Sequence, residues 1–218
     1  MGNLIEQLKN FEGKASKVNK EEELQSIFEE LASAFIYGGY IKVRDNYRVY
    51  IKTVEFYFHS EKADGIHDPI VYHRNGRYLE KAPYFPLMCL HAHNSGFDIT
   101  FESELGEYRA SALIRSYEVK DMQDGKFLKW DTKRCMFVKP DKYCYNTQST
   151  YLYLLLNGFP LGNANDIIRW VDEHREQTTP IALKTRQNVF QSISEWEYKP
   201  IKEKKCERKW SFTRVELV

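Results

Sequence analysis

Two side chains that could take part in chemistry lie close together in residues 53–58, which read Thr-Val-Glu-Phe-Tyr-Phe. Residues two apart on a β-strand point to the same face, so we expect Glu55 and Tyr57 to project side by side. The alternating positions are apolar and would cover the opposite face: Val54, Phe56 and Phe58. A carboxylate on a strand buried from both sides costs several kcal/mol unless it is paired or used. Glu55 is therefore the first candidate for a functional role.

Arg115 is the expected partner of this carboxylate. It follows a run of small and apolar residues, 110–114, in a second predicted strand. An arginine does not lose its charge in a protein, so in apolar surroundings it needs a carboxylate. Glu55 is the obvious choice. The pair could serve a reaction or simply hold two strands together, and the spacing leaves both interpretations open.

A second group of possible ligands lies in residues 89–93, Cys-Leu-His-Ala-His, with Asp98 shortly after it. Imidazoles two apart on a strand can share an ion, so a metal-dependent enzyme centred on His91 and His93 is an alternative. A turn is predicted directly after His93, at residues 94–96, and a His-x-His pair also arises by chance. Both facts favour a site without metal.

The composition limits the possible classes of protein. The 218 residues are 42% hydrophobic and 15% aromatic, which is enough for a substantial core. Because 32 basic residues balance 31 acidic ones, contact with a nucleic acid would need local patches. Nucleotide-binding glycine motifs, a signal peptide and long apolar segments are absent, so we expect a cytoplasmic protein without membrane contact. The four widely spaced cysteines are expected to be reduced and mostly buried.

Hydrophobic periodicity predicts the strands that position these residues. Two β-rich runs, 40–44 and 47–58, are joined at Asp45-Asn46 like a hairpin. Further strands are predicted at 87–91, 97–102 and 108–119. Residues 59–83 form a long irregular segment, and such loops in compact domains are usually functional.

The same periodicity predicts the helices. Asn19 and Glu22 resemble a capping box at the start of a helix over about 20–36, which Gly38-Gly39 ends. A short helix is also predicted over 165–173, and the C-terminal tail ends in a β-like segment. Residues 1–19 form a polar N-terminal extension, loosely ordered or folded as one short amphipathic helix through Leu4, Ile5, Leu8 and Phe11. We expect one α+β domain over 20–218, with a curved, barrel-like antiparallel sheet flanked by a few helices.

Taken in order, these segments resemble the 3-methyladenine DNA glycosylase family, enzymes that excise alkylated purines. The family's helix motif Leu-Ala-x-Ala-Phe-Leu is similar to residues 31–36, and its strand ending Val-Glu-x-Glu-Ala-Tyr is similar to residues 54–57. Later family motifs are an acidic segment with a histidine, an Arg-Asn pair, Asn-Ile, and Leu-Ile-Arg-Ala-x-Glu-Pro. Their counterparts are Asp64 with His67, Arg74-Asn75, Asp98-Ile99 and residues 113–119. The resemblance spans roughly 28–218 and is most specific in its first half.

The resemblance implies a role for each candidate. Glu55 would activate the water that attacks the deoxyribose C1′, and Arg115 would hold that water and Glu55 in register. Tyr57 would stack on a purine flipped out of the duplex. The other substrate-binding residues would be His67, Asp98 and His91. DNA contacts would come from Arg74, Asn75, Arg77 and His93, although residues 72–78 also suit a solvated loop.

The implied partner is double-stranded DNA that carries a damaged purine. The protein would act as a monomer, and it would need neither metal nor organic cofactor. A member of the same fold that binds nucleic acid or another ligand without catalysis is the other possibility within this family.

Overall fold

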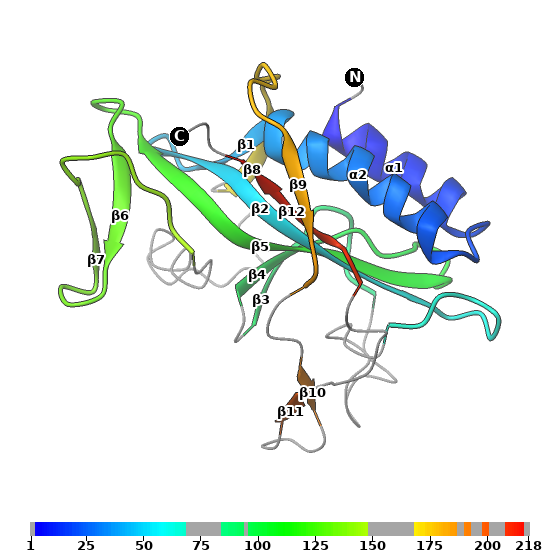
Figure 1. Ribbon diagram of the computed structural model, residues 1–218. Coiled ribbons are helices and arrows are strands. Elements are labelled where there is room, and N and C mark those ends of the chain that lie inside the picture. The colour runs from blue at the N-terminus through cyan, green and yellow to red at the C-terminus, as the bar shows by residue number, and fades with distance from the viewer. Residues whose placement is uncertain are drawn as a thin grey trace.

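The computed structural model describes residues 3–68, 84–93, 96–147, 168–186, 190–192, 198–200 and 208–215 (Figure 1). Two helices lie on one side of a strongly curled antiparallel sheet that forms a half-barrel. This arrangement confirms the predicted α+β class, the single domain and the curved sheet. The opposite face of the sheet carries Glu55, Tyr57 and Arg115.

The first helix, α1 (Leu4–Ala15), decides between the two alternatives for the N-terminal extension, because these residues fold as the short amphipathic helix. It begins at Asn3, whose Oδ1 accepts a hydrogen bond from the Glu6 amide at 2.8 Å, the usual way to satisfy an open helix end. Phe11 packs against α2, β2 and β5 through edge and stacking contacts with other buried rings. The helix is therefore part of the common core, and the domain boundary at residue 19 stays a prediction.

The second helix, α2 (Glu21–Tyr37), confirms the helix predicted over 20–36. Its predicted cap is wrong, because Lys20 and not Asn19 occupies the N-cap position, and no side chain caps the first turn. Three glutamates in the first turn instead stabilise the helix, because their negative charges lie near the positive end of the helix dipole. After the helix, the backbone of Gly39 lies very close to the neighbouring strand that contains Val171. A Cβ atom on residue 39 would lie 2.2 Å from the Val171 carbonyl oxygen. Only glycine fits there.

Ten strands of the described chain form one sheet. They are β1 (Gly39–Val43), β2 (Tyr47–Ser60), β3 (Leu90–His93), β4 (Gly96–Thr100), β5 (Tyr108–Asp121), β6 (Phe127–Asp131), β7 (Met136–Val138), β8 (Ile168–Asp172), β9 (Ile181–Lys184) and β12 (Ser211–Arg214). The main path runs β3-β4-β5-β2-β1-β8, and β12 lies between β2 and β9. Strands β10 (Phe190–Ser192) and β11 (Tyr198–Pro200) form a separate pair.

The segment around residue 170 corrects the sequence analysis. A short helix was predicted over 165–173, but Ile168–Asp172 is strand β8, which pairs antiparallel with β1 from Gly39 to Val43. The ring of Trp170 packs edge-on against Phe35 of α2. Tertiary pairing thus overrides a local pattern that suits either structure. The burial of the cysteines is corrected too, because Cys135 is exposed and Cys89 and Cys144 are half-buried.

A β-bulge interrupts the pairing of β2 with β5, and both strands keep one apolar face on either side of it. Strand β2 buries Val49 and Ile51 in the core, and then Val54 and Phe56, so its inward face shifts by one residue between them. The partner β5 shifts at the same level, and Arg115 has no residue opposite it in the register. Bulges of this kind redirect side chains.

The core lies between the helices and this inward face of the sheet. The rings of Phe28 and Phe56 stack at 4.5 Å between centroids, and Phe101 and Phe212 pack edge-on against Phe56. Burial of these aromatic rings fixes which face of β2 points inward. Glu55 and Tyr57 must then point to the other side.

Candidate functional site

Four neighbouring strands place the candidate residues in one row across the outer face of the sheet. His91 of β3 lies opposite Asp98 of β4, Asp98 opposite Leu113 of β5, and Leu113 opposite Glu55 of β2. Residues directly opposite one another in antiparallel strands point to the same face. With about 4.8 Å per strand, the Cα atoms of His91 and Glu55 are about 14 Å apart. The structure therefore brings together a surface that three separate segments of sequence supply.

Glu55 and Arg115 form the ion pair that the sequence predicted. The Nε of Arg115 donates to Oε2 of Glu55 at 2.6 Å, and the Glu55 side chain is 2% exposed, against 21% for Arg115. The Tyr57 hydroxyl donates to the same carboxylate oxygen at 3.1 Å and accepts from Nη2 of Arg115 at 3.3 Å. The three side chains thus form a closed triangle in which the carboxylate is the acceptor.

The electrostatics of the triangle keep Tyr57 protonated. Burial raises the pKa of the Tyr57 phenol far above its usual range, and the negative charge of Glu55 raises it further. Burial alone would lower the pKa of Arg115, but its interactions with Tyr57 and Glu55 raise it above its ordinary value. A neutral phenol and a charged guanidinium therefore both donate to Glu55.

A second, fully buried ion pair lies beside the triangle. Nη1 of Arg186 donates to Oδ2 of Asp68 at 2.6 Å, and both side chains are 0% exposed. The Arg186 guanidinium carbon lies 4.9 Å from the centre of the Tyr57 ring, so a cation covers one face of that ring. Arg208 approaches the same Asp68 at 3.8 Å and also contacts Glu21 of α2 at 2.6 Å.

Three residues beside the triangle were not among the predicted candidates: Asp68, Arg186 and Arg208. Asp68 directly follows His67, inside the segment already considered functional, so an acidic residue there was a usable signal. Neither arginine has such a signal. Arg186 follows β9 and Arg208 precedes β12, and only the pairing of those strands brings the two together beside β2.

The described contacts of the His67 side chain are with Lys62 and His59, not with Glu55, Tyr57 or Arg115. The ring is exposed, its Nε2 is 2.8 Å from the Lys62 carbonyl oxygen, and it packs 5.0 Å from the His59 ring. The backbone carbonyl of His67 accepts a hydrogen bond from Arg208 at 3.1 Å. The segment is therefore held beside the site, while a substrate-binding role for the imidazole stays a prediction.

Of the remaining predicted site residues, the structure describes the side chains of some and not of others. Asp98 is 2% exposed and accepts a hydrogen bond from the Ser111 hydroxyl at 3.1 Å, and the His91 ring packs 4.7 Å from Phe85. Arg74, Asn75 and Arg77 lie outside the described residues, as does the side chain of His93. Within the described part of the chain, His, Cys, Asp and Glu residues form no group of three or more that could hold a metal ion.

Comparisons with family models, curated proteins and solved structures found no match to this chain. The resemblance to alkylpurine DNA glycosylases therefore rests on the quoted motifs. No described helix is both long and apolar enough to cross a membrane.

Proposed function

We propose that this protein is a DNA N-glycosylase that removes alkylated purines, with Glu55 as the general base. The observation that supports this most is the buried carboxylate of Glu55, which is paired with Arg115 on the sheet face opposite the core residues Val54 and Phe56. A structural ion pair alone would not need the third member, Tyr57, which offers an aromatic ring next to the carboxylate.

The proposed chemistry assigns one task to each member of the triangle. A nucleotide flipped out of the duplex presents its C1′ to a water bound at Glu55. The water oxygen forms a bond to C1′, the C1′–N9 bond breaks with its electron pair going to the purine, and the proton goes to Glu55. An N-alkylated purine carries a positive charge, so it leaves as a neutral base. Arg115 keeps the carboxylate oriented throughout.

Tyr57 would serve as the stacking surface for the flipped base. Its phenol stays neutral because its pKa is raised, so the ring carries no charge of its own. Arg186 lies over one face of the ring, so the purine would stack on the other face. Stacking of a base on an aromatic ring is worth about 1–3 kcal/mol and tolerates different bases.

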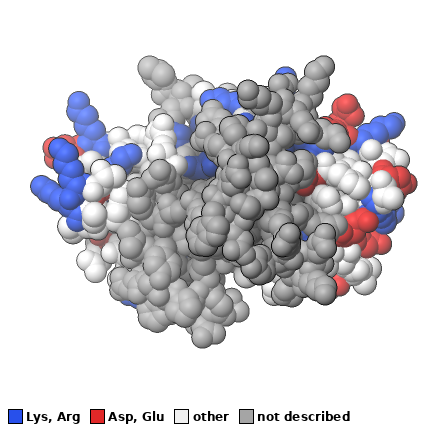
Figure 2. All heavy atoms as spheres, turned by 90° about the horizontal axis from the view of Figure 1, so that it is seen from below, with Lys and Arg blue, Asp and Glu red and all other residues white. Residues whose placement is uncertain are grey.

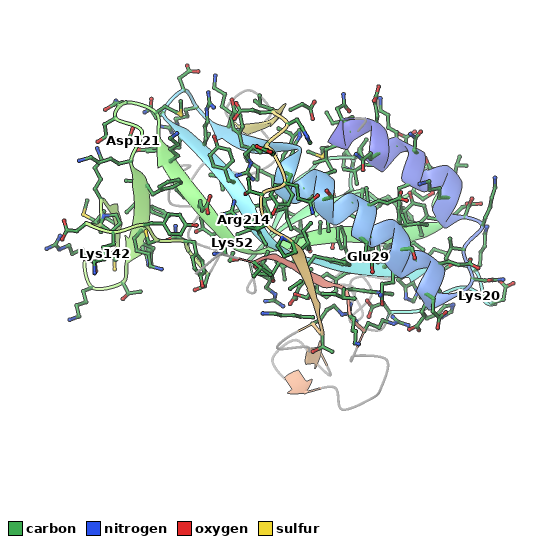
Figure 3. All side chains as sticks on the ribbon, turned by 45° about the horizontal axis from the view of Figure 1, so that its top comes forward. Lys20, Glu29, Lys52, Asp121, Lys142 and Arg214 are labelled. Atoms are coloured by element: carbon green, nitrogen blue, oxygen red, sulfur yellow. The ribbon has the colours of Figure 1, made fainter. Side chains whose placement is uncertain are left out.

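The test is release of free base from methylated duplex DNA, measured by chromatography. The Glu55→Gln variant keeps the shape of the side chain and loses its basicity, so we expect release to fall about 100-fold or more. Glu29→Gln is the matched control, because Glu29 is exposed on α2, on the far side of the sheet (Figure 3). It should release base like the wild type.

Three outcomes would change the proposal. Equal release by wild type and Glu55→Gln would remove Glu55 from the mechanism. Binding of DNA without any release would favour the non-catalytic member of the same fold. Stoichiometric zinc, iron or manganese in the purified protein would favour the metal-dependent alternative at His91 and His93.

A further inference from the structure

A basic arm projects from one end of the sheet. We define the β6–β7 arm as residues 120–145, which include β6, β7 and the segment that returns to β5. From Lys120 to Lys142 the sequence has seven basic and four acidic residues, so the arm alone exceeds the net charge of +1 of the whole chain. The basic residues are Lys120, Lys126, Lys129, Lys133, Arg134, Lys139 and Lys142; the acidic ones are Asp121, Asp124, Asp131 and Asp141.

Three of the four aspartates are engaged within the arm. Asp131 accepts hydrogen bonds from the amides of Lys133 and Arg134 at 2.9 and 3.1 Å, which closes the turn between β6 and β7. Asp121 and Asp124 cap the turn before β6 in the same way, and both pair with Lys139. The acidic groups thus shape the backbone of the arm and pair with Lys139 and Arg134, while the arm as a whole keeps a net positive charge.

Three basic side chains of the arm are exposed, two at the turn between β6 and β7 and one in the segment after β7. Lys133 and Lys142 are exposed, and Arg134 is 70% exposed with a loose ion pair to Asp131 at 3.6 Å. Figure 2, which views the molecule from the side away from the helices, shows blue spheres gathered on the left flank, where the arm lies in Figure 1. Figure 3 places Lys142 at this end and Lys20 at the other.

The arm is firmly anchored. Asn146 is 2% exposed, and its side chain accepts from the Trp130 amide at 2.8 Å and donates to the Leu128 carbonyl at 3.0 Å. Its backbone exchanges two hydrogen bonds with Tyr117 of β5. The exposed basic residues are therefore carried by a preorganised element and not by a loose loop, which lowers the entropy lost on binding.

The base of the arm lies on the same face as the candidate site. The Lys52 ammonium lies 3.7 Å from the centre of the Tyr145 ring, and Lys52 precedes Glu55 by three residues, about 10 Å along β2. On β5, Glu118 binds both Tyr143 of the arm and Arg214 of β12. A long, rod-like ligand that lies over Glu55 and runs along β2 would therefore pass the arm.

From this placement we propose that the β6–β7 arm is the surface that holds the phosphate backbone of duplex DNA. The inference rests on the proposed function, because it supplies the contact that orients the duplex over Glu55. An exposed hairpin with a net positive charge, held in shape by its own hydrogen bonds, suits a polyanion with regularly spaced charges. The arm would contribute affinity without sequence preference.

The experiment compares two variants with the same change in net charge. The arm variant is Lys133→Glu/Arg134→Glu/Lys142→Glu, and the control is Lys9→Glu/Lys17→Glu/Lys20→Glu, whose residues are exposed on the helical side. Affinity for an undamaged duplex of about 20 base pairs is measured by fluorescence anisotropy at several salt concentrations. Circular dichroism and thermal unfolding confirm that both variants are folded.

We expect the arm variant to bind at least about tenfold more weakly and to lower the slope of log K against log salt by roughly 2 to 3, one unit for each lost phosphate contact. The control should change affinity less than about threefold. Equal weakening in both variants would show a general charge effect and overturn the proposal, as would a wild type that does not bind duplex.

Single-turnover base release at saturating protein separates this inference from the proposed function. If the wild type releases no base and the arm variant still loses binding selectively, the surface stands and the glycosylase proposal fails. If the wild type releases base and the arm variant binds like the control, the surface is wrong and the glycosylase proposal stands.

Discussion

The Nε atom of Arg115 lies 2.6 Å from Oε2 of Glu55, at the level where the register between β2 and β5 shifts. Thr53 pairs with Ser116 and Val54 pairs with Ile114, so Arg115 is the extra residue on its strand. The bulge lets the apolar face continue inward while Arg115 leans across the strand pair toward the carboxylate. The central ion pair of the candidate site is thus built on a local departure from regular pairing.

Replacing Arg115 by methionine should destabilise the fold. The change leaves the Glu55 carboxylate buried with Tyr57 as its remaining donor within the triangle, and such a loss costs about 3 kcal/mol for a partly exposed arginine. Urea unfolding at neutral pH measures the change. In the double variant Arg115→Met/Glu55→Gln, most of the lost stability should return, because no charge remains uncompensated. A loss below about 1 kcal/mol in the single variant would contradict a tightly buried pair.

Asp68 and Glu21 both contact Arg208 but differ in burial. Comparing them tests how far burial sets the contribution of an ion pair to stability. Asp68→Asn removes the only negative charge within the buried Asp68–Arg186 pair and should cost about 3–5 kcal/mol in unfolding free energy. Glu21 is 49% exposed, so Glu21→Gln should cost about 0.5 kcal/mol or less. Denaturant unfolding of the two variants side by side gives the comparison. Similar losses would show that burial does not set the strength of these contacts.

Alkaline pH should weaken the fold through Tyr57. Its pKa in the folded protein is raised by burial and by Glu55, above the value of about 10 in the unfolded chain, so the folded state binds the proton more tightly. The stabilisation is complete below about pH 10 and is lost as pH rises, by up to about 1.4 kcal/mol per pH unit. In Tyr57→Phe the loss of stability between about pH 9 and about pH 11 should be shallower than in wild type. Identical slopes in the two proteins would contradict the shift.

Local sequence patterns were sufficient for several elements. The helical spacing of Leu24, Phe28, Leu31 and Phe35 predicts α2, and turn residues at Asp45-Asn46 predict the hairpin of β1 and β2. Alternation over residues 54–58 of β2 gives the shared direction of Glu55 and Tyr57. These features depend on contacts a few residues apart, so the sequence contains their full cause.

Other features depend on partners far away in the chain. Residues 168–172 suit a helix or a strand, and pairing with β1 decides for the strand. Asp68 and Arg186 are separated by more than 100 positions and meet only because β9 reaches β2 through β12. Asn146 anchors the β6–β7 arm through contacts with β5 and β6 that no local pattern indicates.

The sequence by itself determined that a carboxylate and a phenol share one face of an apolar strand, because the period of two along a β-strand is a property of the backbone. It also named Arg115 as the charge that such a carboxylate needs. The tertiary structure decided the rest: the bulge that turns Arg115 toward Glu55, the row that joins His91 and Asp98 to it, and the cation over Tyr57. Register and crossover between distant strands are set by burial of the whole apolar face, and that burial exists only in the folded chain.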